Sequence, residues 1–578
     1  MTEQHAQSAD GVATSKLASR RHEMFPRLET PDIERIRRFG EARSFNAGEA
    51  LARSGEIGIG LVLILSGQAE VTQLDHTGRR VTIVVHKPGS FMGELAQLSG
   101  RPSLVDVTAQ ERVEALVIPS ERLRALLVAE AELGERIMRA LILRRVGLLE
   151  TGAGGPVIVG RAGSGDVLRL VNFLSRNGHP HVHLDPEIDA GARALIERFH
   201  VDPGQLPIVL CPNGEFLRNP SEDQLARCLG LVRQIDPDRV FDVAIVGAGP
   251  AGLATAVYAA SEGLSVLILD CRSFGGQAGA SARIENYLGF PTGISGMALM
   301  ARAYNQAQKF GSEMAIPNEV TRLERLDQGD QGFALHLQDG ERIRCRAVVI
   351  ASGARYRSLR VKDLEAFEST SVHYWASPLE ANLCAGQEVA LVGAGNSAGQ
   401  AVVYLASAVA KVRLLVRGKD VRASMSQYLV DRIEGLANVE IVTSAEITAL
   451  EGANGKLEAV RWTRQPSKEE VRQEIQHLFL FIGADPNTDW LAQSGIVLDA
   501  KGFVLTGRDA GDGRRPLETS IPGVFAIGDV RASSTKRVAA AVGEGAQVVA
   551  ALHGFLADGR AGTPASLHLS GQIADAKS

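Results

Sequence analysis

The sequence predicts a multidomain chain, with several α/β domains behind an all-β N-terminal segment, and three observations lead to this fold class. Two glycine-rich turns, at residues 247–252 and 393–398, each follow a short apolar run with β-branched residues and open a stretch of helical character. A strand that ends at Gly528 and Asp529 follows near the C-terminus. With 578 residues the chain is also too long for one hydrophobic core, so three or four domains are expected.

The composition and charge are those of an ordinary globular protein. Hydrophobic residues make up 45% of the chain and charged residues 22%, and the net charge of −5 does not indicate binding to nucleic acid or to an anionic membrane. No apolar run approaches the length of a membrane span, so none is expected. Residues 1–20 are polar and lack the apolar core of a signal peptide, which predicts a disordered tail and a cytoplasmic protein.

The cysteines form no C-x-x-C pair anywhere in the sequence. An odd number in a cytoplasmic chain predicts that all are reduced and packed as small apolar residues. The five are Cys211, Cys228, Cys271, Cys345 and Cys384. Three histidines, His179, His181 and His183, alternate along a short apolar stretch without cysteine partners, which favours a surface face over a metal site, so no metal is predicted.

Residues 21–150 form the first segment, with short alternating strands between residues 41 and 118. This spacing predicts a jelly roll or barrel, followed by a helix that begins at Ser120. Residues 88–96, with the sequence PGSFMGELA, resemble the start of the phosphate-binding cassette of cyclic-nucleotide-binding domains. The resemblance implies that Gly93 and Glu94 lie at a ligand site and that Glu94 bonds a ribose 2′-hydroxyl.

The arginine that pairs with the cyclic phosphate in that family is missing from its usual place. Ser103 follows Pro102 where this arginine belongs, and Arg101 lies two positions before Ser103. A phosphate without a guanidinium loses its strongest partner. Two interpretations stay open: a site for a cyclic nucleotide or other small effector with help from Arg101, and a ligand-free structural or docking domain.

Residues 155–235 form the second segment, in which short strands and helices alternate before a hairpin at residues 212–215. This order resembles a thioredoxin or glutaredoxin domain, with Pro207 at the position of the family's cis-proline. The family's C-x-x-C would follow the first strand, where residues 161–166 contain no cysteine. We therefore expect a thioredoxin-like α/β domain that carries out no dithiol chemistry.

The third segment begins with the first glycine turn. Such glycines let backbone N–H groups approach a pyrophosphate at a helix N-terminus. Asp270 ends the next strand, 18 residues beyond Gly252, where an acid can accept hydrogen bonds from an adenosine ribose. Two such turns in one chain imply two dinucleotides, and electron transfer between them.

Further motifs narrow this interpretation. They are Gly275-Gly276-Gln277 and residues 285–291, 481–488 and 539–545. Together with the turns they resemble the low-molecular-weight thioredoxin reductases over about 315 residues. The resemblance implies two Rossmann-like α/β domains, one binding FAD (residues 240–358 and 486–560) and one binding NADPH (residues 359–485). The FAD contacts that it implies are Gly247, Gly249, Pro250, Ala251, Asp270, Gly275, Gly276, Gln277, Asn286, Gly353, Gly528, Asp529, Val538 and Ala539.

The second turn is expected to hold the nicotinamide nucleotide. Val416 occupies the position equivalent to Asp270, so no acid is present to bond a ribose 2′-hydroxyl. Arg417 and Arg422 follow, and cations at this place favour the 2′-phosphate of NADPH over NADH. The NADPH contacts expected here are Gly393, Gly395, Asn396, Ser397, Ala398, Arg417 and Arg422.

The chain departs from thioredoxin reductases just before the second turn. The family has its redox-active C-x-x-C there, and this chain has Trp375-Ala376-Ser377-Pro378. The dithiol that would receive electrons from the flavin is therefore absent. Two residues are candidates for a catalytic role: Trp375, as a residue that shields the flavin, and Cys384, as a lone thiol, although plain packing explains either of them as well.

These observations predict an FAD-dependent NAD(P)H oxidoreductase that resembles thioredoxin-disulfide reductase and passes hydride from NADPH to FAD. The electron acceptor stays open because the C-x-x-C is absent, and a homodimer is expected. The alternative is a redox or nucleotide sensor that docks a partner through its N-terminal domains. The intact second nucleotide site favours the enzyme, since a sensor of flavin alone would not need it.

Overall fold

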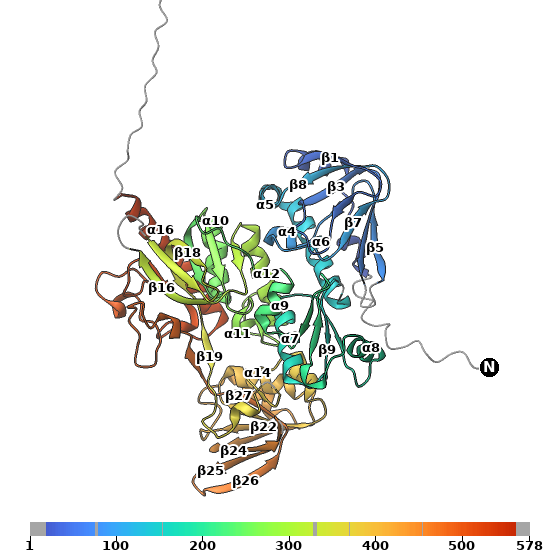
Figure 1. The fold of residues 1–578 in the computed structure, drawn as a ribbon. Helices are drawn as coiled ribbons and strands as arrows, with labels where there is room; N and C mark the ends of the chain where they lie inside the picture. The colour runs from blue at the N-terminus through green and yellow to red at the C-terminus, as the bar shows by residue number, and fades with distance from the viewer. Residues whose placement is uncertain are drawn as a thin grey trace, which may run out of the picture.

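The structure is a computed structural model that describes residues 19–74, 79–152, 154–326, 332–368, 370–453 and 455–561. The predicted tail at residues 1–20 lies outside these residues, apart from its last two. The N-terminal strands and the sheet of strands β24 to β26 lie at opposite ends of the molecule, with the other sheets between them (Figure 1).

The N-terminal segment folds into two four-stranded antiparallel sheets, in the orders β1-β8-β3-β6 and β2-β7-β4-β5. The strands are β1 (Glu41–Phe45), β2 (Ala50–Ala52), β3 (Leu61–Ser66), β4 (Ala69–Leu74), β5 (Arg80–His86), β6 (Phe91–Met92), β7 (Asp106–Ala109) and β8 (Val113–Ile118). The helices are α2 (Arg21–Met24), α3 (Thr30–Arg37), α4 (Ala96–Ser99), α5 (Ser120–Ala129) and α6 (Ala131–Thr151).

Strand β3 shows why these sheets form a closed core. Its side chains alternate between two faces, as the two-residue period of a strand requires. Leu61 and Leu63 pack with the leucines of α5 and α6, whereas Val62 and Ile64 pack between the two sheets. The helix predicted at Ser120 begins there and is followed by the longer helix α6, which leads to the next segment.

The middle segment has a four-stranded sheet in the order β10-β9-β11-β12, in which β9 and β10 are parallel and the others antiparallel. The strands are β9 (Val157–Val159), β10 (Val182–Leu184), β11 (Ile208–Leu210) and β12 (Phe216–Arg218), and the helices are α7 (Gly165–Arg176), α8 (Ala190–Arg198) and α9 (Glu222–Cys228). The peptide bond before Pro207 is cis. Two expectations need correction: His179 is buried rather than on a surface face, and Cys211 and Cys228 are joined as a disulfide, with Cα atoms 6.6 Å apart.

The first large sheet has the order β15-β14-β13-β18-β17-β16, with β29 paired to β18. Strands β15, β14, β13, β18 and β29 run parallel, and β17 and β16 are antiparallel additions. The strands are β13 (Val240–Val246), β14 (Val266–Leu269), β15 (Glu313–Ala315), β16 (Val320–Leu326), β17 (Gly332–Leu337), β18 (Arg342–Ile350) and β29 (Val524–Ala526). The helices are α10 (Pro250–Ser261), α11 (Gly276–Gly279), α12 (Gly296–Lys309) and α16 (Val538–Ala561).

Helix α16 contains the one described helical stretch, Val538–Asp558, that is long and apolar enough to cross a membrane by length and composition, although the sequence predicts no span. Val548, Val549 and Leu552 of this helix pack into the core that also holds Leu253 of α10 and Val243 of β13. The core helix of a globular domain passes the same test of length and composition, so this is weak evidence for a span.

The second large sheet is entirely parallel, in the order β20-β27-β21-β22-β23. Helices α14 and α15 cover one face, and the antiparallel sheet β24-β25-β26 covers the other through the buried Trp462. The strands are β20 (Val372–His373), β21 (Glu388–Gly393), β22 (Lys411–Val416), β23 (Val439–Thr443), β24 (Ala445–Ala453), β25 (Lys456–Arg464), β26 (Glu469–Glu474) and β27 (His477–Phe481). The helices are α13 (Pro378–Leu383), α14 (Asn396–Leu405) and α15 (Gln427–Glu434).

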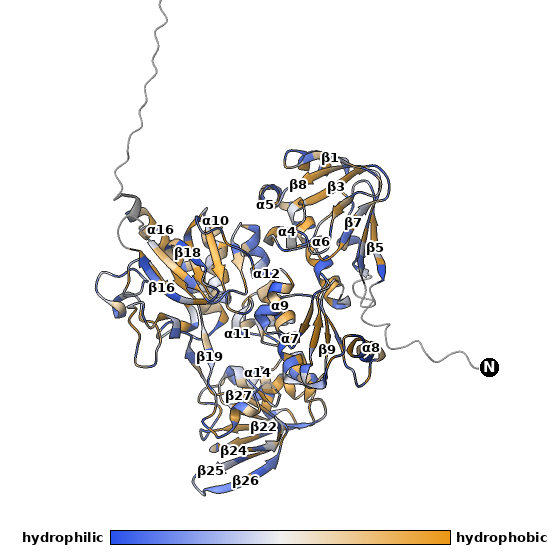
Figure 2. Cartoon of the chain, in the orientation of Figure 1, coloured by the Kyte–Doolittle hydropathy of each residue, from blue (hydrophilic) through white to orange (hydrophobic). Residues whose placement is uncertain are grey.

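Hydropathy follows this layering. The central strands are hydrophobic, whereas β26, at the edge of its sheet, is hydrophilic (Figure 2). Two short antiparallel strands, β19 (Ala354–Tyr356) and β28 (Ala484–Pro486), connect the two parallel sheets. The chain therefore crosses between the two parallel sheets twice, at β19 and at β28. Both crossings lie beside the two glycine turns.

Candidate active site

A cavity of about 680 Å³ lies at the carboxyl ends of the parallel strands β13, β14 and β18. Residues 247–251 follow β13 and residues 270–273 follow β14, and both groups line the cavity. The second parallel sheet contributes Asn396 and Ser397, which begin α14. Open α/β sheets bind ligands at this edge, because the helix N-termini point there.

The first glycine turn has two glycines that the fold requires and one that it does not. A Cβ at Gly247 would overlap the carbonyl oxygen of Ala351, and a Cβ at Gly252 would overlap that of Gly247. Gly249 has ordinary dihedral angles, φ −76° and ψ −175°, and a Cβ there would come no closer than 3.9 Å to any protein atom. The space above Gly249 is therefore free for a ligand, at the N-terminus of α10, where a pyrophosphate fits.

The second turn repeats this arrangement. Gly393 has φ +154°, and a Cβ there would press on Phe481. Gly395, at the N-terminus of α14, has φ −92° and ψ 179°, and a Cβ there would meet nothing within 4 Å. Each turn thus leaves room for an anionic group at its middle glycine. Two dinucleotides would place their pyrophosphates in these two spaces.

Most residues that the sequence predicts for FAD line this one cavity. Gly275 is the exception, because it does not line the cavity. It has φ +96° and donates its N–H to the carbonyl of Ala248 in the first glycine turn. The predicted residues that line the cavity are Gly247, Gly249, Pro250, Ala251, Asp270, Gly276, Gln277, Asn286, Gly353, Gly528, Asp529, Val538 and Ala539.

Asp270 holds the loops around the cavity in place. Its carboxylate accepts the N–H groups of Ala248 at 2.9 Å, Arg272 at 3.1 Å and Ser273 at 3.2 Å. Burial raises the pKa of this carboxyl, and the three N–H groups oppose that shift. A carboxylate has about four lone-pair sites, so one remains for a ribose hydroxyl.

The turn that carries Asp529 is held by a partly buried carboxylate. Glu544 of α16 accepts the N–H of Gly528 at 2.6 Å and pairs with Arg531 at 2.5 Å. Burial raises the pKa of Asp529, and the charge of Glu544 raises it further against the opposing charge of Lys536. Lys536 donates to the backbone carbonyl of Asp529.

Sequence reasoning missed several residues of the cavity, and two of them make hydrogen bonds across it. Arg176, at the end of α7 in the middle segment, donates to the carbonyl of Gly276 at 2.8 Å. Tyr356 of β19 hydrogen-bonds to Ser397, and burial raises the pKa of this phenol to about 12. Both reach the cavity from elements outside the glycine turns, and no local sequence pattern marks such contacts.

Trp375 lines the cavity at the place of the missing C-x-x-C. Its indole N–H donates to Oε1 of the buried Glu380 at 3.0 Å, and Oε2 of Glu380 accepts the N–H of Ser377 at 2.9 Å. The bond from Ser377 to Glu380 is part of a capping box at the start of α13. The tryptophan–carboxylate pair thus fixes the loop in which the resemblance to thioredoxin reductases places the C-x-x-C.

Comparison with known proteins agrees with this geometry. The sequence profile described as "Pyridine nucleotide-disulphide oxidoreductase" matches residues 241–545, more than half of the chain. The chain belongs to this family. A second profile, "Cyclic nucleotide-binding domain", matches residues 42–130, so both of these sequence resemblances are confirmed.

Several members of the oxidoreductase family are similar to this chain. The NADPH-dependent thioredoxin reductase 3 of Arabidopsis thaliana is 32% identical over 312 residues, covering 53% of this chain and 56% of the relative. The thioredoxin reductase of Mycoplasmopsis pulmonis is 30% identical over 314 residues, covering 53% of this chain and 95% of the relative. A crystal structure of Lactococcus lactis thioredoxin reductase superposes with a TM-score of 0.51 at 27% identity, covering 55% of this chain and 99% of that one. The chain spans little more than half the length of the longer relatives.

Within this oxidoreductase, Cys384 does not line the cavity described above. The thiol is fully buried at the end of α13, and burial raises its pKa to about 12, with a further rise from Glu380. His373 and His477 lie beside it, with ring nitrogens 3.0 Å apart, and the ligand atoms of the three lie within 4.8 Å of one another. These three are close enough to hold a metal ion, and we assign Cys384 no part in the reaction.

The predicted NADPH residues fall into three groups. Asn396 and Ser397 line the cavity. Arg417 and Arg422 lie on the exposed loop after β22, and Arg422 pairs with Glu434 and, at 3.7 Å, with Asp420. Arg417 has no ion-pair partner within the part of the chain that the structure describes, so its guanidinium is available to a ligand. Gly393 and Ala398 shape the turn itself.

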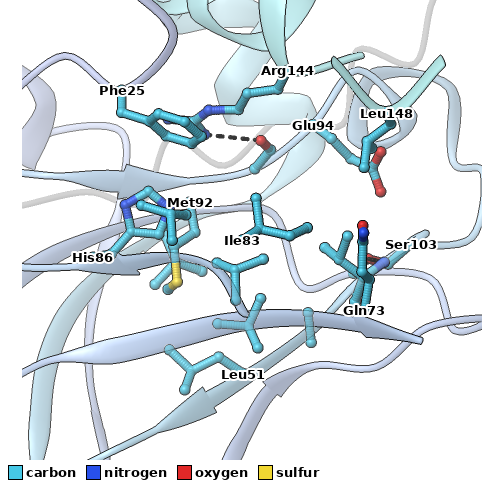
Figure 3. Close-up of a pocket in the computed structure, with 18 of the residues that line it drawn as sticks. Phe25, Leu51, Gln73, Ile83, His86, Met92, Glu94, Ser103, Arg144 and Leu148 are labelled. Atoms are coloured by element: carbon cyan, nitrogen blue, oxygen red, sulfur yellow. Dashed lines mark hydrogen bonds between the residues drawn. The ribbon is translucent and has the colours of Figure 1, made fainter. Parts of the chain in front are cut away.

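The residues predicted for a cyclic nucleotide lie in two different cavities. Gly93 and Glu94 line a cavity of about 320 Å³ between the two N-terminal sheets (Figure 3). Arg101 lines a different cavity, of about 190 Å³, between this segment and the middle segment. This arrangement therefore does not support the expectation that Arg101 replaces the missing arginine at the site of Glu94.

Proposed function

We propose that this oxidoreductase binds FAD at the first glycine turn and NADPH at the second, and transfers hydride from NADPH to FAD. One observation carries the proposal: Gly249 and Gly395 each leave open space at a helix N-terminus, and residues of both turns line one cavity. We propose with it that residues 240–358 and 486–560 bind FAD and that residues 359–485 bind NADPH. We also propose that the middle segment, residues 155–235, is a thioredoxin-like domain without its C-x-x-C.

The residues of the chain have three tasks in this reaction. Backbone N–H groups at the starts of α10 and α14 bind the two pyrophosphates, and Asp270 orients the adenosine ribose of FAD. Tyr356 keeps its proton at neutral pH, since its pKa is about 12, and its bond to Ser397 joins the two nucleotide sites. Bound FAD would accept hydride from the nicotinamide and hold two electrons for an acceptor.

The electron acceptor cannot be reached through a dithiol in the loop that leads into α13. Trp375 and Pro378 occupy the two cysteine positions, and the bond from Trp375 to Glu380 holds this loop against the cavity. An indole carries no exchangeable sulfur, so the loop shields the cavity instead of relaying electrons. We propose an acceptor that takes electrons directly from the flavin, such as a quinone, oxygen or a redox protein.

The test of the proposal is the flavin content and reducibility of the purified chain. We expect yellow protein with about one non-covalent FAD per chain, whose flavin absorbance is bleached by NADPH without oxygen. Acceptors are then screened by their ability to restore that absorbance. Protein that stays colourless after incubation with FAD would overturn the assignment.

NADPH is expected to reduce the flavin faster than NADH, and Arg417→Ala is expected to remove most of that preference. A charge-assisted hydrogen bond to the 2′-phosphate is worth roughly 1.5–3 kcal/mol, or about 10- to 150-fold in the ratio of kcat/KM values. Arg422→Ala should have a smaller effect, because Arg422 already pairs with Glu434. Arg472→Ala, on the remote strand β26, is the matched control. A wild-type preference for NADH would show that this basic loop has been misinterpreted.

Reduction of a thioredoxin-type disulfide with NADPH is expected to be very slow in the wild type. Restoring the cysteine pair with Trp375→Cys and Pro378→Cys should raise this rate at least about 100-fold, because attack on a disulfide needs a thiolate. The single variant Cys384→Ser is the control and should change nothing, since that thiol is buried away from the cavity. Rapid wild-type turnover that survives Cys384→Ser would mean that the flavin reaches disulfides by another route.

A further inference from the structure

The cavity between the two N-terminal sheets is lined mainly by apolar side chains. It measures about 320 Å³, at the small end of the usual range for ligand pockets. Helices α2 and α6 cover it with Phe25 and Leu148 (Figure 3). The apolar side chains that line it from the strands include Leu51, Val62, Val71, Ile83, Met92 and Val107.

The buried cation at this cavity binds backbone groups of the cavity wall. Arg144 donates to the backbone carbonyls of Met24 at 3.0 Å, Gly93 at 3.0 Å and Phe91 at 3.1 Å. Its guanidinium also lies 5.1 Å from the centre of the Phe25 ring and 4.7 Å from that of Phe91. Three of its five N–H groups are thus used by the backbone, and Arg144 closes the wall of the cavity.

The other buried polar groups of the wall carry no positive charge. Burial lowers the pKa of His86 to about 3, so this imidazole is neutral. Ser103 donates its hydroxyl to the carbonyl of Val105 at 2.9 Å. Arg21 stands exposed at the rim, 5.5 Å from the centre of the Phe25 ring. An anion in this cavity would lose its water and find one buried counter-charge, Arg144, which already donates to three backbone carbonyls, so its burial would be costly.

Hydrogen-bond acceptors, in contrast, are in excess. Among the described residues, Oε1 of Gln73, Oε1 of Gln97 and Oε2 of Glu94 are buried and have no hydrogen-bond partner. Glu94 is only 7% exposed and uses its other oxygen to accept the N–H of Leu104 at 3.0 Å. Glu94, Gln73 and Ser103 gather at the same end of the cavity (Figure 3). Buried acceptors without partners are unfavourable, so a ligand with an N–H or O–H group at this end would be stabilised.

Glu94 is also the first of a short series of contacts that reaches the flavin cavity. Its free oxygen lies 3.6 Å from Nη1 of Arg145, and the same guanidinium donates to the carbonyl of Gly178 at 3.1 Å. Gly178 follows the end of α7, where Asn177 donates to the carbonyl of Arg272 at 3.0 Å and Arg176 to that of Gly276. Arg272 and Gly276 both line the flavin cavity.

We propose that the N-terminal cavity binds an uncharged, largely apolar small molecule through a hydrogen-bond donor at Glu94 and Gln73, in place of a cyclic nucleotide. Occupancy is coupled to FAD binding through Arg145 and the end of α7. A ligand that donates to Glu94 competes with Arg145 for that carboxylate, and Arg145 supports the backbone that holds the flavin loop. The coupling rests on the proposed FAD site, whereas ligand binding in the N-terminal cavity does not.

The binding experiment uses the full-length protein and N-phenyl-1-naphthylamine, an uncharged fluorescent amine with one N–H. We expect a saturable rise in fluorescence for about one molecule per chain, with no displacement by millimolar cyclic AMP. Ile83→Trp should fill the cavity and abolish binding, and Gln73→Leu should weaken it about tenfold by removing an acceptor. Ile188→Trp, at an 85% exposed position, is the control. Displacement by micromolar cyclic AMP, or unchanged binding to Ile83→Trp, would overturn the proposed ligand class.

The coupling experiment compares the dissociation constant of the same probe in protein with and without FAD. Coupling between sites is reciprocal and typically 5-fold or more, so the two wild-type constants should differ by at least about 5-fold. In Arg145→Met the probe should still bind, and its dissociation constants with and without FAD should be equal. Arg169→Met removes an arginine of α7 that lines neither cavity, and it should keep the wild-type ratio. Equal wild-type constants would overturn the coupling alone. A chain that binds the probe without binding FAD would overturn the proposed function and, with it, the coupling, but not the ligand site in the N-terminal cavity.

Discussion

A Gly249→Val variant is expected to fold and to be purified without flavin. The valine side chain would point into the open space above the first glycine turn, where the pyrophosphate of FAD is proposed to bind. Loss of two charge-assisted hydrogen bonds, at roughly 1.5–3 kcal/mol each, raises the FAD dissociation constant at least about 100-fold. The dissociation constant is measured by the fluorescence of free flavin.

The folded state itself should tolerate this change. Gly249 has dihedral angles that any residue adopts, and its Cβ would meet no protein atom within 3.9 Å. Valine is a poorer N-cap than glycine, so we expect a loss of about 1 kcal/mol in the unfolding free energy of the flavin-free protein. A yellow Gly249→Val protein with wild-type affinity for FAD would place the flavin elsewhere.

The matched variant Gly395→Val is expected to give yellow protein that NADPH no longer reduces. The same geometry places this valine above the second turn, where NADPH is proposed to bind. The rate of flavin reduction at limiting NADPH should fall at least about 100-fold, by the same loss of hydrogen bonds. A chemical reductant such as dithionite should bleach the flavin normally, because the FAD site is unchanged.

The two variants separate the two nucleotide sites. If Gly395→Val lost its flavin and Gly249→Val did not, the assignment of the turns would have to be exchanged. If both kept flavin and NADPH reduction, neither turn would be a nucleotide site.

The sequence was most informative where a function needs consecutive residues. The glycine turns, Asp270 and Asp529 could be predicted because each lies in a short motif at the end of a parallel strand, and such strands bring their ends to one edge. The middle glycines, Gly249 and Gly395, gain their meaning from the structure, which shows that the fold itself does not require them.

Contacts between distant elements could not be predicted in this way. Arg176 reaches Gly276 from the middle segment, and Arg145 reaches both Glu94 and Gly178. Cys211 and Cys228 meet only because β11 and α9 pack together. None of these pairs has a spacing that a helix or strand period reveals, and the packing of separate elements decides them.

Cys384 shows what a single position leaves open. The sequence favours packing for every cysteine, with a lone reactive thiol near the second turn as the alternative. The structure places Cys384 in the core beside two histidines, with a raised pKa, and reactivity follows thiolate character and exposure. This burial agrees with the packed residue that the sequence favours.

The central claim is that NADPH reduces a bound flavin and that no dithiol shares the electrons. An anaerobic titration of the FAD-loaded protein with NADPH tests it most directly. Each NADPH carries two electrons, so we expect complete bleaching of the flavin at about one NADPH per FAD, with no further uptake. An end point near two NADPH per FAD would reveal a disulfide that exchanges electrons with the flavin. Absence of bleaching would show that NADPH bound at the second turn does not reduce the flavin at the first. Either result would contradict this account.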